Sequence, residues 1–375
     1  MFKDLLKNYI YPIATLSGTI IGVGLFSLPY ITSIVGIEVI FLYFLILGGL
    51  VILIHQFFGE LSLKTPDFKR LPGFAKIYLG RPGEITAYVS TVVGLLGALL
   101  AYLIVGGEFL SALLSPFFSG SSFHYTFLYF AIGSVIIYFG IKAISRVEFW
   151  GLVLFFLILF LIFIKAFPYI NLSNVFNFSF KLNFSNFFLP YGAILFSLWG
   201  ASLVPEVEEM LKDKRQLVRK IIPLSILVPI FIYLFFIFLV LGITGSQTTE
   251  SALLGLQNFL GNGIVSLGLF FGVLTTFTSF IALGLTLKKV LWYDLKLDKK
   301  HAWVITCFVP MILFLLGIQQ FLPLISFLGA VMIGIDGILI LLMYKKIKPA
   351  RKFLIYSLML IFLTGIIFEI ITIIK

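Results

Sequence analysis

Apolar stretches recur along the whole chain, and short segments that carry most of the charged side chains separate them. A helix needs about 20 consecutive, mostly apolar residues to cross a bilayer, so the pattern predicts an all-α integral membrane protein. We expect eleven transmembrane helices, at residues 9–35, 38–58, 86–114, 124–143, 147–169, 187–211, 221–243, 262–287, 302–318, 322–344 and 353–374. The composition agrees, because 61% of the residues are hydrophobic and only 11% are charged.

The distribution of lysine and arginine predicts how these spans are oriented. If the N-terminus is cytoplasmic, 24 of the 27 basic residues lie in inner segments, and only Lys165, Lys181 and Lys375 do not. The positive-inside rule therefore predicts a multi-pass protein of the cytoplasmic membrane, with its N-terminus inside and its C-terminus outside. The net charge of +11 is spread over five loops and one terminus, which argues against a nucleic-acid partner.

The first span contains residues that interrupt a helix. Gly18, Gly22 and Gly24 lie within seven residues and Pro29 follows them. Each glycine costs about 1 kcal/mol relative to alanine inside a helix. Backbone that leaves the helical path at membrane depth is tolerated where it is buried in protein or lines a cavity, so we expect a binding site here. Gly18 and Gly22 also form a small-xxx-small pattern, for which close helix packing is the alternative interpretation.

The sixth span has a matching interruption, with Trp199, Gly200, Ala201 and Ser202 at its centre and Pro205 after them. Interrupted helices at corresponding positions of two halves indicate the binding site of a transporter. We therefore expect one transmembrane domain over residues 1–375, with five-helix repeats at 8–170 and 186–345 and an additional helix at 353–374. Because each repeat has an odd number of spans, the second is inverted. The halves share no residue-level identity, so the repeat rests on spacing and breaks.

An interrupted helix exposes N–H groups at the start of one half and C=O groups at the end of the other. The N–H end suits a carboxylate, and the C=O end suits an ammonium group or a metal cation. An amino-acid zwitterion offers both charges a few ångströms apart, and glycine lets it approach the main chain closely. The two breaks therefore suit an amino acid.

At these residues the chain resembles the amino acid–polyamine–organocation (APC) superfamily with the LeuT fold. The motifs are Gly18-Thr19-Ile20-Ile21-Gly22-Val23-Gly24 with Pro29, Ala101-Tyr102 with Gly107-Glu108, Val204-Pro205-Glu206 and Thr278-Ser279-Phe280. Over residues 10–345, the chain is similar to the amino acid/auxin permease group, which includes bacterial tryptophan/tyrosine permeases. The resemblance implies a LeuT-like 5+5 inverted repeat with discontinuous helices 1 and 6, and secondary transport of amino acids by alternating access.

The resemblance also implies a substrate site. The amides of Val23 and Gly24 would hold the carboxylate, and the region of the Ile20 carbonyl would hold the ammonium group. Tyr102 would close the pocket, and Trp199 would act as a gate. The implied substrate-binding residues are Thr19, Ile20, Gly22, Val23, Gly24, Tyr102, Trp199, Gly200, Ala201 and Ser202. The small residues among them leave room for an apolar or aromatic substrate side chain.

A coupling-ion site is implied in the same way. At the cation position of sodium-coupled relatives, the carbonyls of Gly18 and Ile21 face Thr275, Thr278 and Ser279. Proton-coupled members can carry a lysine within span 5, and residues 149–164 contain none, which keeps sodium open. The likeness to tryptophan/tyrosine permeases favours protons. We expect no cofactor besides this coupling ion, H⁺ or Na⁺.

Ionisable residues inside spans are rare and are functional candidates by default. Glu108 in span 3 and Glu206 after the second break are the proton-relay candidates. An alternative role for Glu206 is to stabilise the dipole of its half-helix. Asp336 could pair with a buried partner or take protons, and the structural role is favoured. His55 is expected to be a core histidine with its hydrogen bonds satisfied. The lone Cys307 excludes an internal disulfide, and no catalytic cluster supports an enzyme.

The sequence thus predicts a symporter that imports amino acids, with hydrophobic or aromatic substrates favoured, using a proton or sodium gradient. The alternatives are a polyamine or organic-cation carrier of the same fold, a channel and a transport-inactive membrane sensor. The predicted partners are a small-molecule substrate and the lipid bilayer. The identity of the amino acid, the choice of ion and the oligomeric state stay open.

Overall fold

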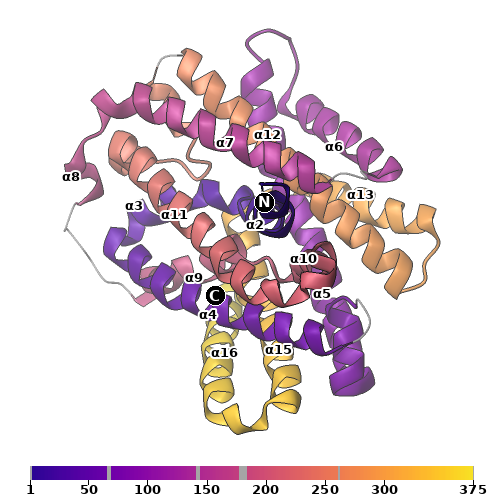
Figure 1. The fold of residues 1–375 in the computed structure, drawn as a ribbon. Helices are drawn as coiled ribbons and strands as arrows, with labels where there is room; N and C mark the ends of the chain where they lie inside the picture. Colours follow the sequence, from indigo (N-terminus) through magenta and orange to yellow (C-terminus); the bar gives the residue numbers. More distant parts are fainter. Residues whose placement is uncertain (1, 66–68, 141–143, 177–183, 261, 375) are drawn as a thin grey trace.

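The computed structural model describes residues 2–65, 69–140, 144–176, 184–260 and 262–374. Within these ranges the chain is helical and contains no strand. In the bundle, α5 (Leu71–Leu114) packs along α12 (Asn262–Lys289), and α2 (Tyr11–Ile20) packs against both α7 (Ile144–Ala166) and α11 (Val218–Thr244) (Figure 1). Lys181 and Lys375, which the orientation argument used, lie outside the described residues.

The first span is bent where its glycines are. It begins with α1 (Phe2–Leu5) and the π-helical turn η1 (Leu6–Ile10), and α2 then ends at Ile20. The 3₁₀ turn η2 (Val23–Ser27) and α3 (Leu28–Val35) follow, and the two parts of the span are bent by 49°. Pro29 lies in the first turn of α3, where its missing N–H costs no helical hydrogen bond.

The rest of the first half contains α4 (Ile37–Lys64), α5, α6 (Ser122–Phe139) and α7, followed by the short turns η3 (Phe167–Tyr169) and α8 (Leu172–Val175). Gly80 divides α5, because its φ of 74° lies in the left-handed region that favours glycine. The long part of α5 after this kink carries Ser90, Tyr102 and Glu108.

The second half begins with the second interrupted span. It consists of α9 (Phe184–Leu198), the 3₁₀ turn η4 (Ala201–Leu203) and α10 (Val204–Leu211). The elements that follow are η5 (Lys212–Leu217), α11, η6 (Gly245–Gln247), η7 (Gly255–Asn258), α12, η8 (Val290–Asp294), α13 (Lys299–Leu315), α14 (Phe321–Phe327), η9 (Leu328–Met332), α15 (Ile333–Ile347), η10 (Pro349–Arg351) and α16 (Lys352–Ile374).

Nine helical segments in the described ranges are long and apolar enough to cross a membrane, or ten if the bent first pair is one span. The expected span at 302–318 corresponds to α13, whose 17 residues leave it outside this set. The total of eleven transmembrane helices therefore stays a prediction, and so does the division into two inverted repeats.

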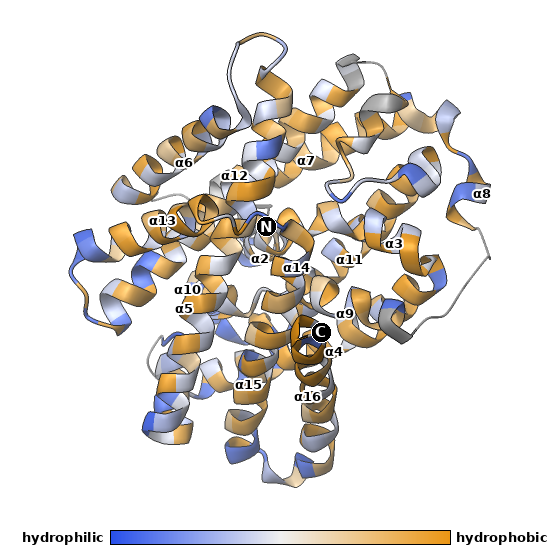
Figure 2. Cartoon of the chain, turned by 180° about the vertical axis from the view of Figure 1, so that it is seen from behind, coloured by the Kyte–Doolittle hydropathy of each residue, from blue (hydrophilic) through white to orange (hydrophobic). Residues whose placement is uncertain are grey.

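The outer surface of the bundle suits lipid. Large apolar side chains are exposed on several helices, including Phe41, Phe231 and Phe353, which is 87% exposed. Figure 2 shows hydrophobic residues along most helices and hydrophilic residues at helix ends, such as the turn between α15 and α16. An extended apolar exterior of this kind is typical of a protein that is solvated by lipid tails.

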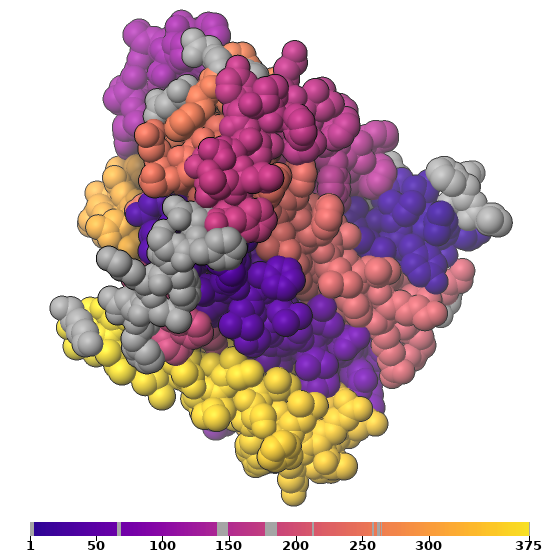
Figure 3. Space-filling view, turned by 90° about the vertical axis from the view of Figure 1, so that its left-hand side faces the viewer, coloured from indigo at the N-terminus to yellow at the C-terminus, as the bar shows by residue number. Residues whose placement is uncertain are grey.

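The C-terminal helix is an addition to this bundle. It forms a hairpin with α15 at the lower edge of the molecule (Figures 1 and 3). The hydroxyl of Tyr191 donates to the carbonyl of Ile361 at 3.0 Å, and the ring of Phe362 lies against Gly337, where a Cβ would meet it. These contacts hold α16 against α9 and α15 on the outside of the bundle.

Candidate functional site

The backbone leaves the helical path at both predicted interruptions. After α2, Ile21 has φ −74° and ψ 82°, and Gly22 is extended with φ −124° and ψ −153°. After α9, Trp199 and Gly200 belong to no helix, and Gly200 has φ −135° and ψ 14°. Val23 and Gly24 begin η2, so their N–H groups have no acceptor inside that turn.

Tyr233 of α11 joins the two interruptions. Its hydroxyl lies 2.6 Å from the carbonyl oxygen of Ile20 and 2.7 Å from that of Ser197, so its single proton serves either acceptor. The two segments also approach closely, because a Cβ on Gly24 would lie 2.3 Å from the Ser197 hydroxyl oxygen. A buried side chain and a glycine therefore fix the breaks against each other.

His55 of α4 satisfies the backbone of the second interruption. Its Nδ1 lies 2.8 Å from the Val51 carbonyl, which can only accept, so Nδ1 carries the proton. Nε2 then accepts the N–H of Gly200 at 3.0 Å, and the imidazole is neutral. The expected role of His55, a core histidine with satisfied hydrogen bonds, is confirmed. Its ring also packs edge-on against Trp199, with 5.0 Å between ring centroids.

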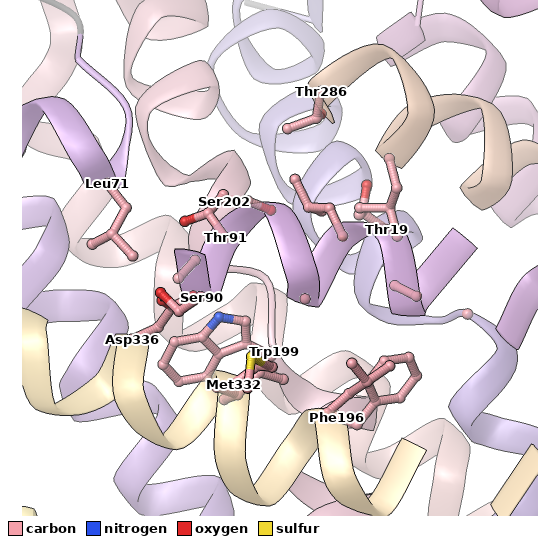
Figure 4. A pocket seen from close by; sticks show the side chains of 18 of the residues that line it. Thr19, Leu71, Ser90, Thr91, Phe196, Trp199, Ser202, Thr286, Met332 and Asp336 are labelled. Atoms are coloured by element: carbon pink, nitrogen blue, oxygen red, sulfur yellow. The ribbon is translucent and has the colours of Figure 1, made fainter. Parts of the chain in front are cut away.

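A cavity of about 110 Å³ lies between the two interruptions and extends toward α5, α12 and α15 (Figure 4). Eight of the ten expected substrate-binding residues line it: Thr19, Ile20, Gly22, Gly24, Tyr102, Trp199, Ala201 and Ser202. Val23 and Gly200 do not. The Val23 side chain is fully buried, and a Cβ on Gly200 would meet Ile20 and Leu16, so that glycine packs against α2.

Tyr102 covers the first interruption in this conformation. A Cβ on Gly22 would lie 1.8 Å from the Tyr102 hydroxyl oxygen, so the hydroxyl is in contact with this glycine. The same hydroxyl is hydrogen-bonded to the backbone of Val23 and to the side chain of Ser279. The amide that the resemblance assigns to a substrate carboxylate is therefore occupied by a side chain of the protein.

A second, smaller cavity brings together all five expected coupling-ion residues. Gly18, Ile21, Thr275, Thr278 and Ser279 line it, and the rest of the wall comes from α7 and from Leu274 of α12. Its volume of about 20 Å³ is close to that of one water molecule by the same measure. Thr275 and Thr278 donate their hydroxyl protons to the carbonyls of Phe271 and Thr275, so their oxygen lone pairs remain available. These neutral oxygens fit a hard monovalent cation.

Neither proton-relay candidate lines the central cavity. Glu206, in the first turn of α10, forms an ion pair with Arg70 at 2.7 Å between Nη2 and Oε1. Glu108 faces a different cavity, of about 520 Å³, where Glu250 and Gln320 are among the lining residues. The described residues contain no group of three or more histidine, cysteine or acidic side chains that could hold a metal ion.

The structure places other polar groups in the central cavity that the sequence did not assign to it. These are Arg70, Ser90, Thr91, Ser197, Thr286 and Asp336. Ser90 donates its hydroxyl to Oδ1 of Asp336 at 2.5 Å, across 246 residues of sequence. Asp336 was expected to be structural. Its position within a predicted span was the available signal, because an intramembrane carboxylate is a functional candidate.

Comparisons with known proteins agree with this geometry. A sequence model of the tryptophan/tyrosine permease family matches residues 7–374. In a comparison with curated protein sequences, none matches the chain significantly.

Several solved structures share the fold. A crystal structure of MhsT in complex with L-phenylalanine has a TM-score of 0.66 at 14% identity, and the match covers 96% of this chain and 98% of that one. Mhp1, a nucleobase-cation-symport-1 family transporter in a closed conformation, has a TM-score of 0.64 at 14% identity, with 97% and 90% covered. A manganese transporter of Eremococcus coleocola has a TM-score of 0.62 at 12% identity, with 99% and 88% covered. These similarities concern the fold, and they agree with the LeuT-like architecture expected from the sequence.

Proposed function

The chain belongs to the tryptophan/tyrosine permease family, and on that basis we propose that it imports an aromatic amino acid by alternating access, driven by a proton or sodium gradient. The observation that carries this proposal is the cavity shared by the two interrupted spans. Tyr102 and Trp199 border that cavity, together with the non-helical backbone at Gly22. The complex of MhsT with L-phenylalanine supports an aromatic substrate within the same fold.

In the proposed site, the substrate carboxylate binds at the start of η2. The N–H groups of Val23 and Gly24 carry the partial positive charge of a helix N-terminus. Tyr102 occupies this place in the present conformation, so the tyrosine turns to donate its hydroxyl to the arriving carboxylate. The ammonium group binds near the carbonyl of Ile20, where it replaces one of the two donors, Tyr233 or the N–H of Gly22, that this carbonyl has in the present conformation.

The proposed coupling to a cation has two alternatives. For sodium, the small cavity between α2, α7 and α12 supplies neutral oxygens, and it adjoins the first interruption through Ile21. For a proton, the transporter needs an ionisable side chain that changes its charge during the cycle. Either ion would bias the cycle by binding more tightly to one of the two conformations.

Uptake into proteoliposomes tests the proposed function. The purified protein is supplied with labelled tryptophan, tyrosine, phenylalanine, a panel of other amino acids and putrescine, with sodium and pH gradients imposed separately. We expect accumulation of an aromatic amino acid under one of these gradients. Absence of gradient-driven uptake of every amino acid would contradict the proposal. Uptake of putrescine alone would establish the organic-cation alternative, which the carboxylate of Asp336 in the cavity makes worth testing.

A further inference from the structure

Asp336 is the one acidic side chain among the described residues that line the central cavity. It lies in the first turn of α15, just after the π-helical turn η9, and its Oδ1 accepts the hydroxyl proton of Ser90 from α5. Figure 4 shows Asp336 and Ser90 together beside the indole of Trp199. The carboxylate therefore lies next to Trp199, a residue of the second interruption.

No cation compensates this carboxylate in the described part of the chain. Arg70 is the one basic residue that lines the cavity there, and it is paired with Glu206. Several titratable side chains on the elements that pack against α15 have other partners. On α4, His55 is used by Gly200 and Val51, and Glu60 accepts from Tyr344. On α5, Glu84 pairs with Lys76, and Tyr102 with Val23 and Ser279. On α16 and the turn before it, Tyr356 accepts from Lys345, and Arg351 donates to Tyr344. Asp336 has Ser90 as its one polar partner among the described residues.

An ionised carboxylate at membrane depth without a counter-charge is energetically unfavourable, and binding a proton removes that charge. We propose that the Asp336–Ser90 pair is the site at which the coupling proton binds and leaves during the transport cycle. This inference rests on the proposed function, since it assigns the coupling ion of that same transporter. The step is balanced by water: a proton from the cavity adds to the free oxygen, Oδ2, and returns to water when the cavity opens to the other side.

The position of Asp336 allows substrate and proton to affect each other. One cavity is lined by Gly22, Trp199 and Asp336, so a bound substrate changes the solvation of the carboxylate directly. Such a mutual effect on binding is the coupling free energy that a symporter requires. The two carboxylates expected from the sequence lack this position, because Glu206 is neutralised by Arg70 and Glu108 faces another cavity.

The test compares coupled transport with exchange. Asp336→Asn is reconstituted into proteoliposomes that contain a pH-sensitive dye, and two quantities are measured with labelled tryptophan: counterflow without any gradient, and accumulation with proton entry under a pH gradient. We expect counterflow to stay within about threefold of wild type, while pH-driven accumulation and substrate-linked proton entry fall by about tenfold or more. Glu369→Gln is the matched control, since it removes an intramembrane carboxylate on α16 that lies outside the cavity, and it should leave both quantities unchanged.

A second variant covers the case in which Asp336→Asn does not fold. Ser90→Ala keeps the carboxylate but removes the hydrogen bond that stabilises its ionised form. We expect counterflow to persist and the midpoint of the pH profile of uptake to move to higher pH by about half a unit or more.

Each contrary result identifies what has failed. The inference would be overturned if substrate-linked proton entry is unchanged in both Asp336→Asn and Ser90→Ala. Loss of counterflow in a folded Asp336→Asn protein would overturn it in favour of direct substrate binding by this carboxylate. Wild-type counterflow with no proton movement would refute proton coupling but leave amino-acid transport intact. Absence of wild-type counterflow would refute the proposed function itself.

Discussion

Side chains of the protein occupy the backbone groups that the two interruptions expose. Tyr102 is hydrogen-bonded to the Val23 backbone, His55 accepts the Gly200 amide, and Tyr233 donates to the Ile20 carbonyl. An unpaired backbone group at membrane depth costs several kcal/mol, so some partner is required when no substrate is present. A carboxylate that binds at the Val23 amide would have to replace Tyr102, whereas the hydrogen bond between His55 and the Gly200 amide can stay in place.

Gly22→Ala tests this arrangement at a single residue. The backbone angles of Gly22 are open to any residue, but the added Cβ would lie 1.8 Å from the Tyr102 hydroxyl. Such overpacking lowers the free energy of unfolding by about 1–3 kcal/mol. We expect uptake to fall by about tenfold, because the tyrosine is displaced. Adding Tyr102→Phe removes the atom that lies closest to the new Cβ, so it should restore part of the lost thermal stability, while uptake stays low because the hydroxyl proposed to bind the carboxylate is gone.

The control for this prediction is Gly49→Ala. Gly49 lies in α4 with nothing within 4 Å of an added Cβ, so uptake should stay at the wild-type level. Equal uptake by Gly22→Ala and Gly49→Ala would show that Tyr102 does not need its position at Gly22.

At the scale of helices, contacts between distant elements hold the cavity walls in place. Tyr233 attaches α11 to the ends of both α2 and α9. The pair of Arg70 and Glu206 attaches the start of α5 to α10 at the edge of the cavity. These contacts connect the interrupted segments to continuous helices, which is the arrangement a transporter needs to move them as units.

Tyr233→Phe should loosen the two interruptions. The substitution leaves the carbonyls of Ile20 and Ser197 without this donor in a fully buried place, at a cost of about 1–2 kcal/mol. We expect a lower temperature of thermal unfolding in detergent, measured together with uptake. Tyr293→Phe is the control, because Tyr293 is 62% exposed and should show no change. Unaltered stability of Tyr233→Phe would mean that the shared hydroxyl contributes little.

Charge exchange at the cavity edge decides between two roles of Glu206. If it serves as an ion-pair partner, Glu206→Gln and Arg70→Gln should reduce uptake to a similar extent, and the double exchange Arg70→Glu with Glu206→Arg should recover part of it. If Glu206 relays protons, only Glu206→Gln should abolish pH-driven uptake. We expect the first result, measured as uptake under a pH gradient for the four proteins.

At the scale of the whole molecule, the distribution of charge predicts a membrane orientation that labelling can test. Cys307 is buried and is the single cysteine of the chain, so a Cys307→Ser background gives clean single-cysteine variants. Lys300 lies in the first turn of α13 and Gln319 lies beyond its last residue, and both are exposed. They are therefore suitable reporters for the two sides of the membrane.

With the N-terminus inside, Lys300→Cys should react with a membrane-impermeant maleimide only after cells are opened, and Gln319→Cys should react in intact cells. This pattern would also show that α13 crosses the membrane despite its 17 residues. Labelling of both positions from the same side would remove α13 from the set of spans and contradict the predicted topology.

Local features of the chain were sufficient to predict much of this fold. Hydrophobic stretches, glycines and prolines influence the backbone of the residues next to them. They were therefore sufficient to predict the helices, the bend after Ile20 and the break at Trp199 and Gly200. The resemblance supplied the ten substrate positions, of which eight line the cavity, and the five positions that share the small cavity.

The tertiary structure alone decided which side chains meet. Ser90 and Asp336 are 246 residues apart, and His55 and Gly200 are 145 apart, so no local pattern connects either pair. The partner of a buried polar group depends on how two helices cross and rotate, and the sequence of one helix does not contain that information. For this reason the sequence alone located the interruptions of the helices, while only the packed bundle showed that Asp336 lines the cavity between them.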